Sequence, residues 1–546
     1  MNEKPFHVSD MDQQFQHSLP DQGSGDQNVR MSIENLLQKN PIDLLRAAVT
    51  ERRPILRGIL AEHGTKTVLE YSRGFNHVSL PDFSLELSRV LESLHNVAAP
   101  ILGDDVASRL QERLESKPVL QTGDHHGPLL HSLFVSGNIL MALPDLMEGT
   151  QSVVPVAAFG DVPLNNVSYP IGFRLTERLP HRSDTGAGPA PYGSVSLFPD
   201  KKKRMLVAAA PAYGQNAVKK AVERVGELQQ LGVITPSKAD VIVGVLEQVF
   251  ANPRTLEQPD YASQITRINA DLWRHFFADR CNVDMAYIQM ESIVAHRLDR
   301  MLADGEDNMI TATLLDPVFR DRVMARFDGI PGCWSADGQG TRFFWGIPKG
   351  GKHDGQAIAL HAKDGFLVDP NHECLPPVEL SADSLRTALR EGRIKPGMFL
   401  SFGVMQFLAG IRCFGGFMQT DYLTQMRAAW SDVLRESGEA ENAVRIDQLP
   451  VANYSVGPLA FFVERNTAVA SGLGREAVGA GGFDLIANPI TQDDLFNLAR
   501  HTLGDLNAPG LPDAYRIVYG TEADSRLCAI TPDVVIRETL PNLIRE

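Results

Sequence analysis

Gln121-Thr-Gly-Asp-His-His-Gly-Pro128 is a polar loop between two apolar segments, and its surroundings decide the predicted fold. Residues Leu129 to Leu143 have the pattern of a mostly buried helix, which we expect to end at Pro144. Val153 to Phe159 is a short apolar run rich in valine, which is typical of a buried parallel strand. This alternation of loop, helix and strand predicts an α/β protein with a doubly wound parallel core.

The chain of 546 residues is long enough for roughly two to four domains, because single hydrophobic cores stop growing near ~250–300 residues. Helical periodicity dominates before the polar loop, as in Ser84 to His95, and it returns from Gly214 onward. Strand-like segments such as Arg342 to Gly346 follow this second helical region. We therefore expect a disordered lead-in (1–30), an N-terminal helical part (31–117), a first core segment (118–213), a helical insertion (214–325), a second core segment (326–436) and a C-terminal mixed α/β region (437–546).

Composition limits the classes of partner. The net charge of −15 argues against a general nucleic-acid binder, whose surface would carry a basic face. The five cysteines are scattered and none forms a Cys-x-x-Cys pair, a pattern of reduced thiols and not of a disulfide scaffold or a zinc knuckle. No apolar run approaches the ~18–20 residues of a membrane span, and the polar N-terminus lacks the apolar core of a secretory signal. We expect a cytoplasmic protein with a small-molecule substrate and with no nucleic-acid or membrane partner.

Five motifs follow one another along the chain: Thr122-Gly-Asp-His-His-Gly-Pro-Leu129, Val154-Pro-Val-Ala-Ala-Phe-Gly-Asp161, Pro191-Tyr-Gly-Ser-Val-Ser-Leu197, a strand pair within Arg342 to Leu367, and Phe414-Gly-Gly-Phe-Met-Gln-Thr-Asp-Tyr422. In this order they resemble the motifs of the cysteine-adding enzymes (cysteine ligases) of bacillithiol biosynthesis. That family has a Thr-Gly-Gln-Gln loop before a Gly-Pro-Leu helix, a Val-Pro-Val-aromatic strand and a Gly-Gly-Pro-Gly-Glu-x-x-Tyr segment. No single motif is specific, and the resemblance rests on their order.

The resemblance implies a Rossmann-like core interrupted by insertions, with a nucleotide-type pocket at the strand ends. It also implies formation of an amide between cysteine and an amino-sugar conjugate. The chain departs from the family in two places. The family's Glu-Asp-His-Asp cluster survives only as Asp161, because Val162 to Asn166 stands where the other members are expected. The family's C-terminal coiled coil has no counterpart after Arg435, which leaves the oligomeric state open.

The Asp-His-His loop concentrates groups that can bind a phosphate or move a proton. After a strand and before a helix, it would lie at the carboxyl edge of a parallel sheet, where α/β proteins bind ligands. Histidine titrates near neutral pH, and the N-terminus of the following helix favours an anion. We therefore predict Asp124, His125 and His126 as catalytic residues. The alternative is a helix cap with two exposed histidines.

Two further carboxylates follow buried segments. Asp161 ends the valine-rich strand and is predicted to be catalytic. A carboxylate there can activate an amine, hold a metal or bind a ribose hydroxyl; the alternative is a turn or cap aspartate before Pro163. Asp421 takes the place of a family glutamate in a second strand–loop–helix unit, and its alternative is an ordinary residue in the first turn of a helix.

A phosphate-bearing group or a nucleotide would lie between the two loops, where glycines let a ligand approach the backbone closely. The predicted cofactor-binding residues are Thr122, Gly123, Gly127, Gly415, Gly416, Asp421 and Tyr422.

Two familiar sites are not supported. His125, His126 and His131 are close in sequence, but adjacent histidines usually point in different directions and no metal-binding motif is present, so no metal site is predicted. Gly346 to His353 has the spacing of a P-loop, yet it has His353 where a Ser or Thr hydroxyl is needed, and strand-like residues follow. We interpret it as a hairpin turn.

The leading hypothesis is a ligase-like enzyme that joins an amino acid, with cysteine as the candidate, to an amine or carboxyl partner in a specialised biosynthetic pathway. In it, the Asp-His-His loop orients the activated group, while Asp161 and Asp421 hold the nucleophilic amine. One alternative is a ligand-binding or scaffold protein that has kept the fold and lost catalysis. The other is a metal-dependent enzyme that uses His125 and His126.

Overall fold

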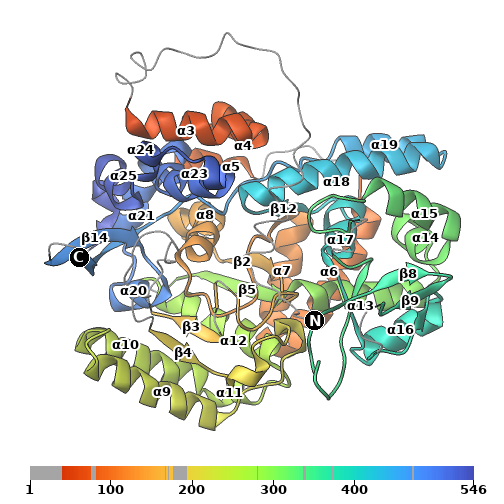
Figure 1. The fold of residues 1–546 in the computed structure, drawn as a ribbon, viewed down its shortest axis with the longest axis horizontal. Coiled ribbons are helices and arrows are strands. Elements are labelled where there is room, and N and C mark those ends of the chain that lie inside the picture. Colours follow the sequence, from red (N-terminus) through yellow and green to blue (C-terminus); the bar gives the residue numbers. More distant parts are fainter. Residues whose placement is uncertain are drawn as a thin grey trace.

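The computed structural model describes residues 40–75, 82–166, 168–169, 171–175, 193–279, 281–335, 340–370, 374–469 and 472–545. The predicted disordered lead-in at residues 1–30 lies outside these described residues. A parallel sheet crosses the middle of the molecule, and helices and small antiparallel sheets surround it (Figure 1).

The central sheet contains four strands: β1 (Val119–Gln121), β2 (Ser152–Ala158), β5 (Val283–Gln289) and β12 (Arg412–Phe414). All of them are parallel, in the order β12-β1-β2-β5. The last residues of β2 and β5, Ala158 and Gln289, lie opposite each other, so the carboxyl ends of these strands are neighbours. Every residue of β2 is buried, which explains its continuous apolar sequence, since a strand covered on both faces has no polar side.

Helices cover both faces of this sheet. Alternate side chains of a strand point to opposite faces, and β2 accordingly contributes to two separate hydrophobic cores. Val154 and Val156 pack in one core with α8 (Ser132–Glu148) and α12 (Tyr261–His275). Val153 and Ala157 pack in the other core, whose helices are α6 (Ser84–Leu102), α7 (Asp104–Ser116) and α13 (Met290–Ala303). The predicted α/β class with a parallel sheet is confirmed.

Helix α8 does not end where the sequence predicts. It runs through Pro144 to Glu148 and is closed by Gly149, whose φ is +65°. Leu143, Pro144 and Leu146 are all buried, and we attribute the tolerance of proline to this packing, which offsets the lost backbone hydrogen bond.

The strand order creates a switch point in the sheet. The chain adds β2 and β5 on one side of β1, and it later adds β12 on the other side. Connections therefore leave the carboxyl ends of β1 and β12 in opposite directions. Open α/β sheets bind ligands at such points, and both predicted loops, at residues 122–127 and 415–416, lie there.

The predicted helical insertion at residues 214–325 contains a core strand. Strand β5, an edge of the central sheet, lies inside this segment. A seven-residue apolar run cannot be distinguished from a piece of buried helix by periodicity, which is why the prediction missed it. The other elements of the segment are α9 (Gln215–Gln230), α10 (Pro236–Val245), η3 (Leu246–Phe250), α11 (Pro253–Leu256), α12, α13, α14 (Met309–Leu315) and α15 (Pro317–Arg326).

Three small antiparallel sheets are formed by segments that follow β2 in the chain. They are β3 (Gly172–Arg174) with β4 (Ser194–Ser196); β6 (Phe344–Gly346) with β7 (Ile358–Ala359) and β11 (Ile394–Pro396); and β8 (His361–Lys363) with β9 (Phe366–Val368) and β10 (Val378–Glu379). β6 and β7 are antiparallel neighbours, so the segment with P-loop spacing lies between two strands, as the hairpin interpretation requires. Short turns η1 (Asp200–Lys202) and η2 (Val207–Ala209) follow β4.

The N-terminal helices lie beside the C-terminal part of the chain (Figure 1). They are α3 (Pro41–Arg52), α4 (Pro54–His63) and α5 (Val68–Gly74), and α3 packs on α23 (Leu511–Tyr519). The remaining elements are α16 (Ala382–Arg390), α17 (Met398–Phe402), η4 (Gly403–Leu408), α18 (Phe417–Glu436), α19 (Ala440–Asp447), β13 (Phe462–Val469), β14 (Gly472–Gly479), α20 (Gly482–Ala487), α21 (Gln492–Arg500), α22 (Leu503–Asn507), η5 (Ala508–Gly510), η6 (Gly520–Glu522), α24 (Ser525–Cys528), α25 (Pro532–Thr539), η7 (Pro541–Leu543) and β15 (Ile544–Arg545). Among the helices described, none is both long and apolar enough to cross a membrane.

Candidate functional site

The loops after β1 and β12 are in direct contact at the switch point. The hydroxyl of Thr122 donates to the carbonyl of Phe414 at 3.1 Å and accepts from Nε2 of Gln419 at 2.8 Å. A Cβ on Gly123 would lie 2.9 Å from the Cα of Gly415, so the two backbones touch. The structure therefore brings these predicted residues together. The hydroxyl of Thr122 and the backbones of Gly123 and Gly415 contact the neighbouring loop.

Gly127 packs against the ring of Tyr169. A Cβ at this position would lie 2.2 Å from that ring, so only glycine fits here without a shift of the ring. Its role in cofactor binding stays a prediction.

Asp124 lies within the loop after β1, and its side chain is fully buried. Its Oδ2 accepts a hydrogen bond from Nδ2 of Asn138 in α8, at 2.8 Å. Burial raises the pKa of Asp124 to about 7, and hydrogen bonds from Asn138 and Tyr287 oppose this rise. The enclosed carboxyl positions the loop through Asn138, and its catalytic role stays a prediction.

The two adjacent histidines point in different directions. His126 is fully buried, and its Nε2 lies 2.9 Å from the carbonyl of Ala262 in α12, a contact that makes it a donor. Burial lowers the pKa of His126 to about 4. This neutral ring connects the loop to α12, and its catalytic role stays a prediction.

His125 is partly exposed and remains a candidate. Its ring centroid lies 5.8 Å from that of Phe134, and His131 lies on the same phenyl ring at 5.2 Å. Burial lowers the pKa of both imidazoles to about 4. Both are therefore neutral at physiological pH, and a neutral imidazole can donate one N–H to a ligand.

A second carboxylate lies beside Asp161, and the sequence did not reveal it. Glu291, in the first turn of α13, accepts the backbone N–H of Gly160 at 2.9 and 3.0 Å and that of Asp161 at 3.0 Å. A Cβ on Gly160 would lie 3.1 Å from the Glu291 carboxylate and 2.3 Å from Gln289, so only glycine permits this contact without displacing a neighbour.

Burial raises the pKa of both carboxyls in this acidic pair of Asp161 and Glu291. The negative charge of Asp161 adds to the rise for Glu291, since two neighbouring carboxylates resist ionising together. Groups of this kind, poised to exchange a proton near neutral pH, are characteristic of acid–base sites.

Three further residues surround the acidic pair. Nε1 of Trp345, in β6, lies 3.4 Å from Oδ2 of Asp161. Lys395, opposite Trp345 in β11, is close enough to Glu291 for their charges to interact. Tyr422, in α18, is buried near Asp161, so this predicted residue does reach the acidic pair.

Asp421 has a different environment. Its carboxylate forms an ion pair with Arg53 at 3.1 Å, which ties α18 to the N-terminal helices. Adjacent residues on a helix face different directions, and so Asp421 does not share the surroundings of Tyr422. The structure pairs Asp421 with Arg53, and its role in holding an amine stays a prediction.

Backbone strain occurs on both sides of the site. Phe343, just before β6, has φ of 71°, and Ile171, two residues after Tyr169, has φ of 59°. Bulky and β-branched residues are rare outliers at positive φ, and strain of this kind concentrates at functional sites. Each strained residue lies two positions from a side chain near the site, Phe343 from Trp345 and Ile171 from Tyr169.

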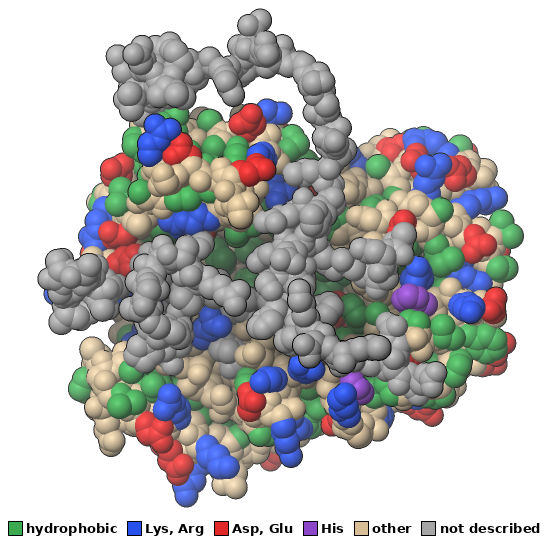
Figure 2. Space-filling view, viewed as in Figure 1, with side chains coloured by type: hydrophobic (Ala, Val, Ile, Leu, Met, Phe, Trp, Pro, Cys, Tyr) green, Lys and Arg blue, Asp and Glu red, His purple; other side chains and the backbone are tan. Residues whose placement is uncertain are grey.

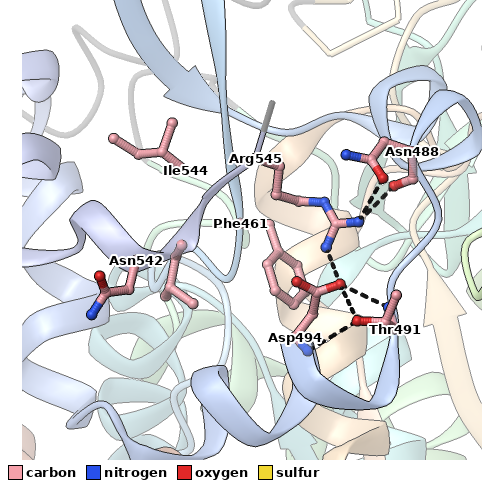
Figure 3. A pocket seen from close by; sticks show the side chains of 8 residues that line it. Phe461, Asn488, Thr491, Asp494, Asn542, Ile544 and Arg545 are labelled. Atoms are coloured by element: carbon pink, nitrogen blue, oxygen red, sulfur yellow. Dashed lines mark hydrogen bonds and ion pairs between the residues drawn. The ribbon is translucent and has the colours of Figure 1, made fainter.

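Two other kinds of site find little support in the structure. Among the described residues, no group of three or more His, Cys, Asp or Glu side chains is arranged to hold a metal ion. A pocket of about 260 Å³ lies near Arg545, but of the eight residues that line it the two charged ones, Arg545 and Asp494, pair with each other at 2.6 Å (Figure 3). We therefore place the candidate site at the carboxyl edge of the central sheet. Figure 2 shows recessed hydrophobic side chains near the middle of one face of the molecule.

No protein-family model matches the chain, and no curated protein matches it. The assignment of a function therefore depends on the geometry of the site.

Proposed function

We propose that the protein is a ligase-like enzyme that forms an amide between an amino acid and an activated acyl partner, on a Rossmann-like core. The observation that carries the proposal is the acidic pair at the carboxyl ends of β2 and β5. Glu291 supplies the second carboxylate that residues 162–166 lack, so the site has the acid–base groups that an amide-forming enzyme needs. In chain order the strands β5-β2-β1-β12 read 3-2-1-4, which are four of the six strands of the Rossmann order 3-2-1-4-5-6, and this supports the proposed core.

The chemistry requires a base, because an amine is protonated at neutral pH and cannot attack an acyl carbon in that form. In the proposed step Asp161 accepts a proton from the substrate's ammonium group. The amine nitrogen then attacks the acyl carbon of an acyl phosphate. The C–N bond forms, the C–O bond to phosphate breaks, and the phosphate leaves with the bonding electrons and takes up the second proton that the nitrogen loses as it becomes the amide N–H. The neutral N–H of His125 donates a hydrogen bond to the oxygen on which charge develops.

The nucleotide implied by the resemblance does not fit between the two switch-point loops. Gly123 and Gly415 are in contact there, and the hydroxyl of Thr122 is occupied by Phe414 and Gln419. We route no step through a nucleotide, and the acyl group is proposed to arrive already activated.

Asp161→Asn tests the proposal. Purified protein would be assayed for amide formation between free amino acids, beginning with cysteine, and acyl phosphates. We expect the variant to lose turnover by about 10²–10⁴-fold while it keeps its fold. Asp43→Asn is the matched control, since this exposed aspartate pairs with Arg46 on α3 and should leave turnover unchanged. Equal turnover in wild type and Asp161→Asn would refute the role of the acidic pair.

A further inference from the structure

Lys395 and Trp345 approach the acidic pair from a separate antiparallel sheet. They are directly opposite each other in β11 and β6, so their side chains leave the sheet on the same face, with Cβ atoms about 5 Å apart. The indole of Trp345 reaches Asp161, and Lys395 interacts electrostatically with Glu291. The small sheet therefore holds an ammonium group beside two carboxyls.

The ammonium group of Lys395 has no hydrogen-bond or ion-pair partner among the residues that the structure describes. Glu291 does not provide one, because its carboxylate oxygens accept the backbone N–H groups of Gly160 and Asp161. Lys395 is half-buried, and desolvation lowers its pKa, while the charges of Glu291 and Asp260 oppose that shift. Its ammonium group is therefore available to the anionic group of a ligand that binds beside the two carboxyls.

The surroundings restrict which anion can bind. A phosphate with two negative charges at Lys395 would be repelled by the acidic pair. An anion that carries its own cation avoids this repulsion, because the cation can turn toward the carboxyls. A free α-amino acid has this distribution of charge, with its ammonium and carboxylate on one carbon.

We infer that Asp161 and Lys395 bind the ammonium and the carboxylate of one free α-amino acid, with Trp345 beside its side chain. This inference rests on the proposed function and names the amino-acid subsite within it. It predicts that the enzyme distinguishes a free amino acid from its ester, since only the free acid offers a carboxylate to Lys395.

Binding of L-cysteine and of L-cysteine methyl ester, followed by calorimetry, tests the inference. We expect wild type to bind the free acid at least about 10-fold more tightly than the ester, the effect of one charge-assisted contact. Lys395→Met should abolish this preference by weakening the free acid alone, and Lys395→Arg should retain part of it. Lys352→Met is the matched control, because Lys352 is exposed on the turn between β6 and β7. Circular dichroism would verify the fold of each variant, and Lys395→Arg provides the test if Lys395→Met does not fold.

The outcomes separate the inference from the proposed function. If Lys395→Met and Lys395→Arg keep the wild-type preference for the free acid while Asp161→Asn abolishes turnover, the subsite is overturned and the ligase-like function stands. If wild type neither binds any of the common amino acids nor forms an amide from them, both are overturned.

Discussion

The carboxylate of Glu291 accepts the backbone N–H of Asp161 at 3.0 Å, although 130 positions separate the two residues in the chain. This contact joins the carboxyl ends of β2 and β5 and creates the acidic pair. It also uses backbone donors at the end of β2 that would otherwise have to find water or a ligand. The second carboxyl is thus part of the scaffold as well as of the proposed chemistry.

Removal of the Glu291 side chain should destabilise the protein strongly. Glu291→Ala leaves the N–H groups of Gly160 and Asp161 without partners, at about 2–5 kcal/mol in the free energy of unfolding. Glu291→Gln keeps an oxygen acceptor of the same shape and should cost about 1 kcal/mol or less. Urea unfolding of both variants measures the difference.

Glu522→Ala is the control, since it breaks an exposed ion pair with Arg52 and should change stability little. Equal losses for Ala and Gln at position 291 would contradict the role of the carboxylate oxygens.

Local sequence patterns predicted the elements that the core buries most completely. The valine-rich run became β2, because burial on both faces selects an unbroken apolar strand. The loop after β1 and the Gly-Gly turn after β12 were placed at one sheet edge, and the structure has them in contact. Each of these predictions depends on residues close together in sequence.

The acidic pair could not be predicted in this way. Glu291 follows an apolar run between helices, and only pairing of β5 with β2 brings it to Asp161. Trp345 and Lys395 depend on the register of a small antiparallel sheet, which sequence alone did not specify. One signal was available, because an acidic residue at the start of a helix after a short apolar run is typical of a βα turn.

Gly127 and Gly226 should respond in opposite ways to alanine. In Gly127→Ala the new methyl group would overlap the Tyr169 ring, where contact falls to 2.2 Å, and should destabilise the protein by about 1–3 kcal/mol. Gly226 lies within α9 with no atom within 4 Å of an added Cβ, so Gly226→Ala should stabilise by about 0.5–1 kcal/mol. Thermal and urea unfolding measure both effects. An unchanged stability in Gly127→Ala would show that Tyr169 moves aside without cost.

The buried carboxyl of Asp124 should make stability fall as pH rises. The folded protein keeps its proton up to about pH 7, whereas an unfolded aspartate releases it near pH 4. Between these values the folded state binds more protons, so raising the pH favours unfolding, by up to about 4 kcal/mol across the window. The histidines contribute in the opposite direction between pH 6.5 and 4, so the informative quantity is the difference between wild type and Asp124→Asn.

Asp124→Asn imitates the protonated carboxyl and should remove this pH dependence. Its free energy of unfolding relative to wild type should rise progressively from pH 4 to pH 8, as measured by urea unfolding at each pH. A difference that stays constant over this range would mean that Asp124 ionises normally in the folded protein.

His125 and His126 should separate function from stability. His125→Ala should lower kcat by about 10²-fold with little change in the free energy of unfolding, because it removes a partly exposed donor that is proposed to stabilise developing charge. Added imidazole should restore part of the activity, which a purely structural role would not allow.

His126→Ala should instead cost about 1–3 kcal/mol of stability, since the carbonyl of Ala262 loses its buried partner. At temperatures where it is folded, its kcat should stay within about threefold of wild type. Burial holds the pKa of both rings near 4, so neither should titrate in a profile of kcat between pH 5.5 and 8. A loss of kcat in His126→Ala as large as that in His125→Ala, or a failure of imidazole to rescue His125→Ala, would contradict this division of roles.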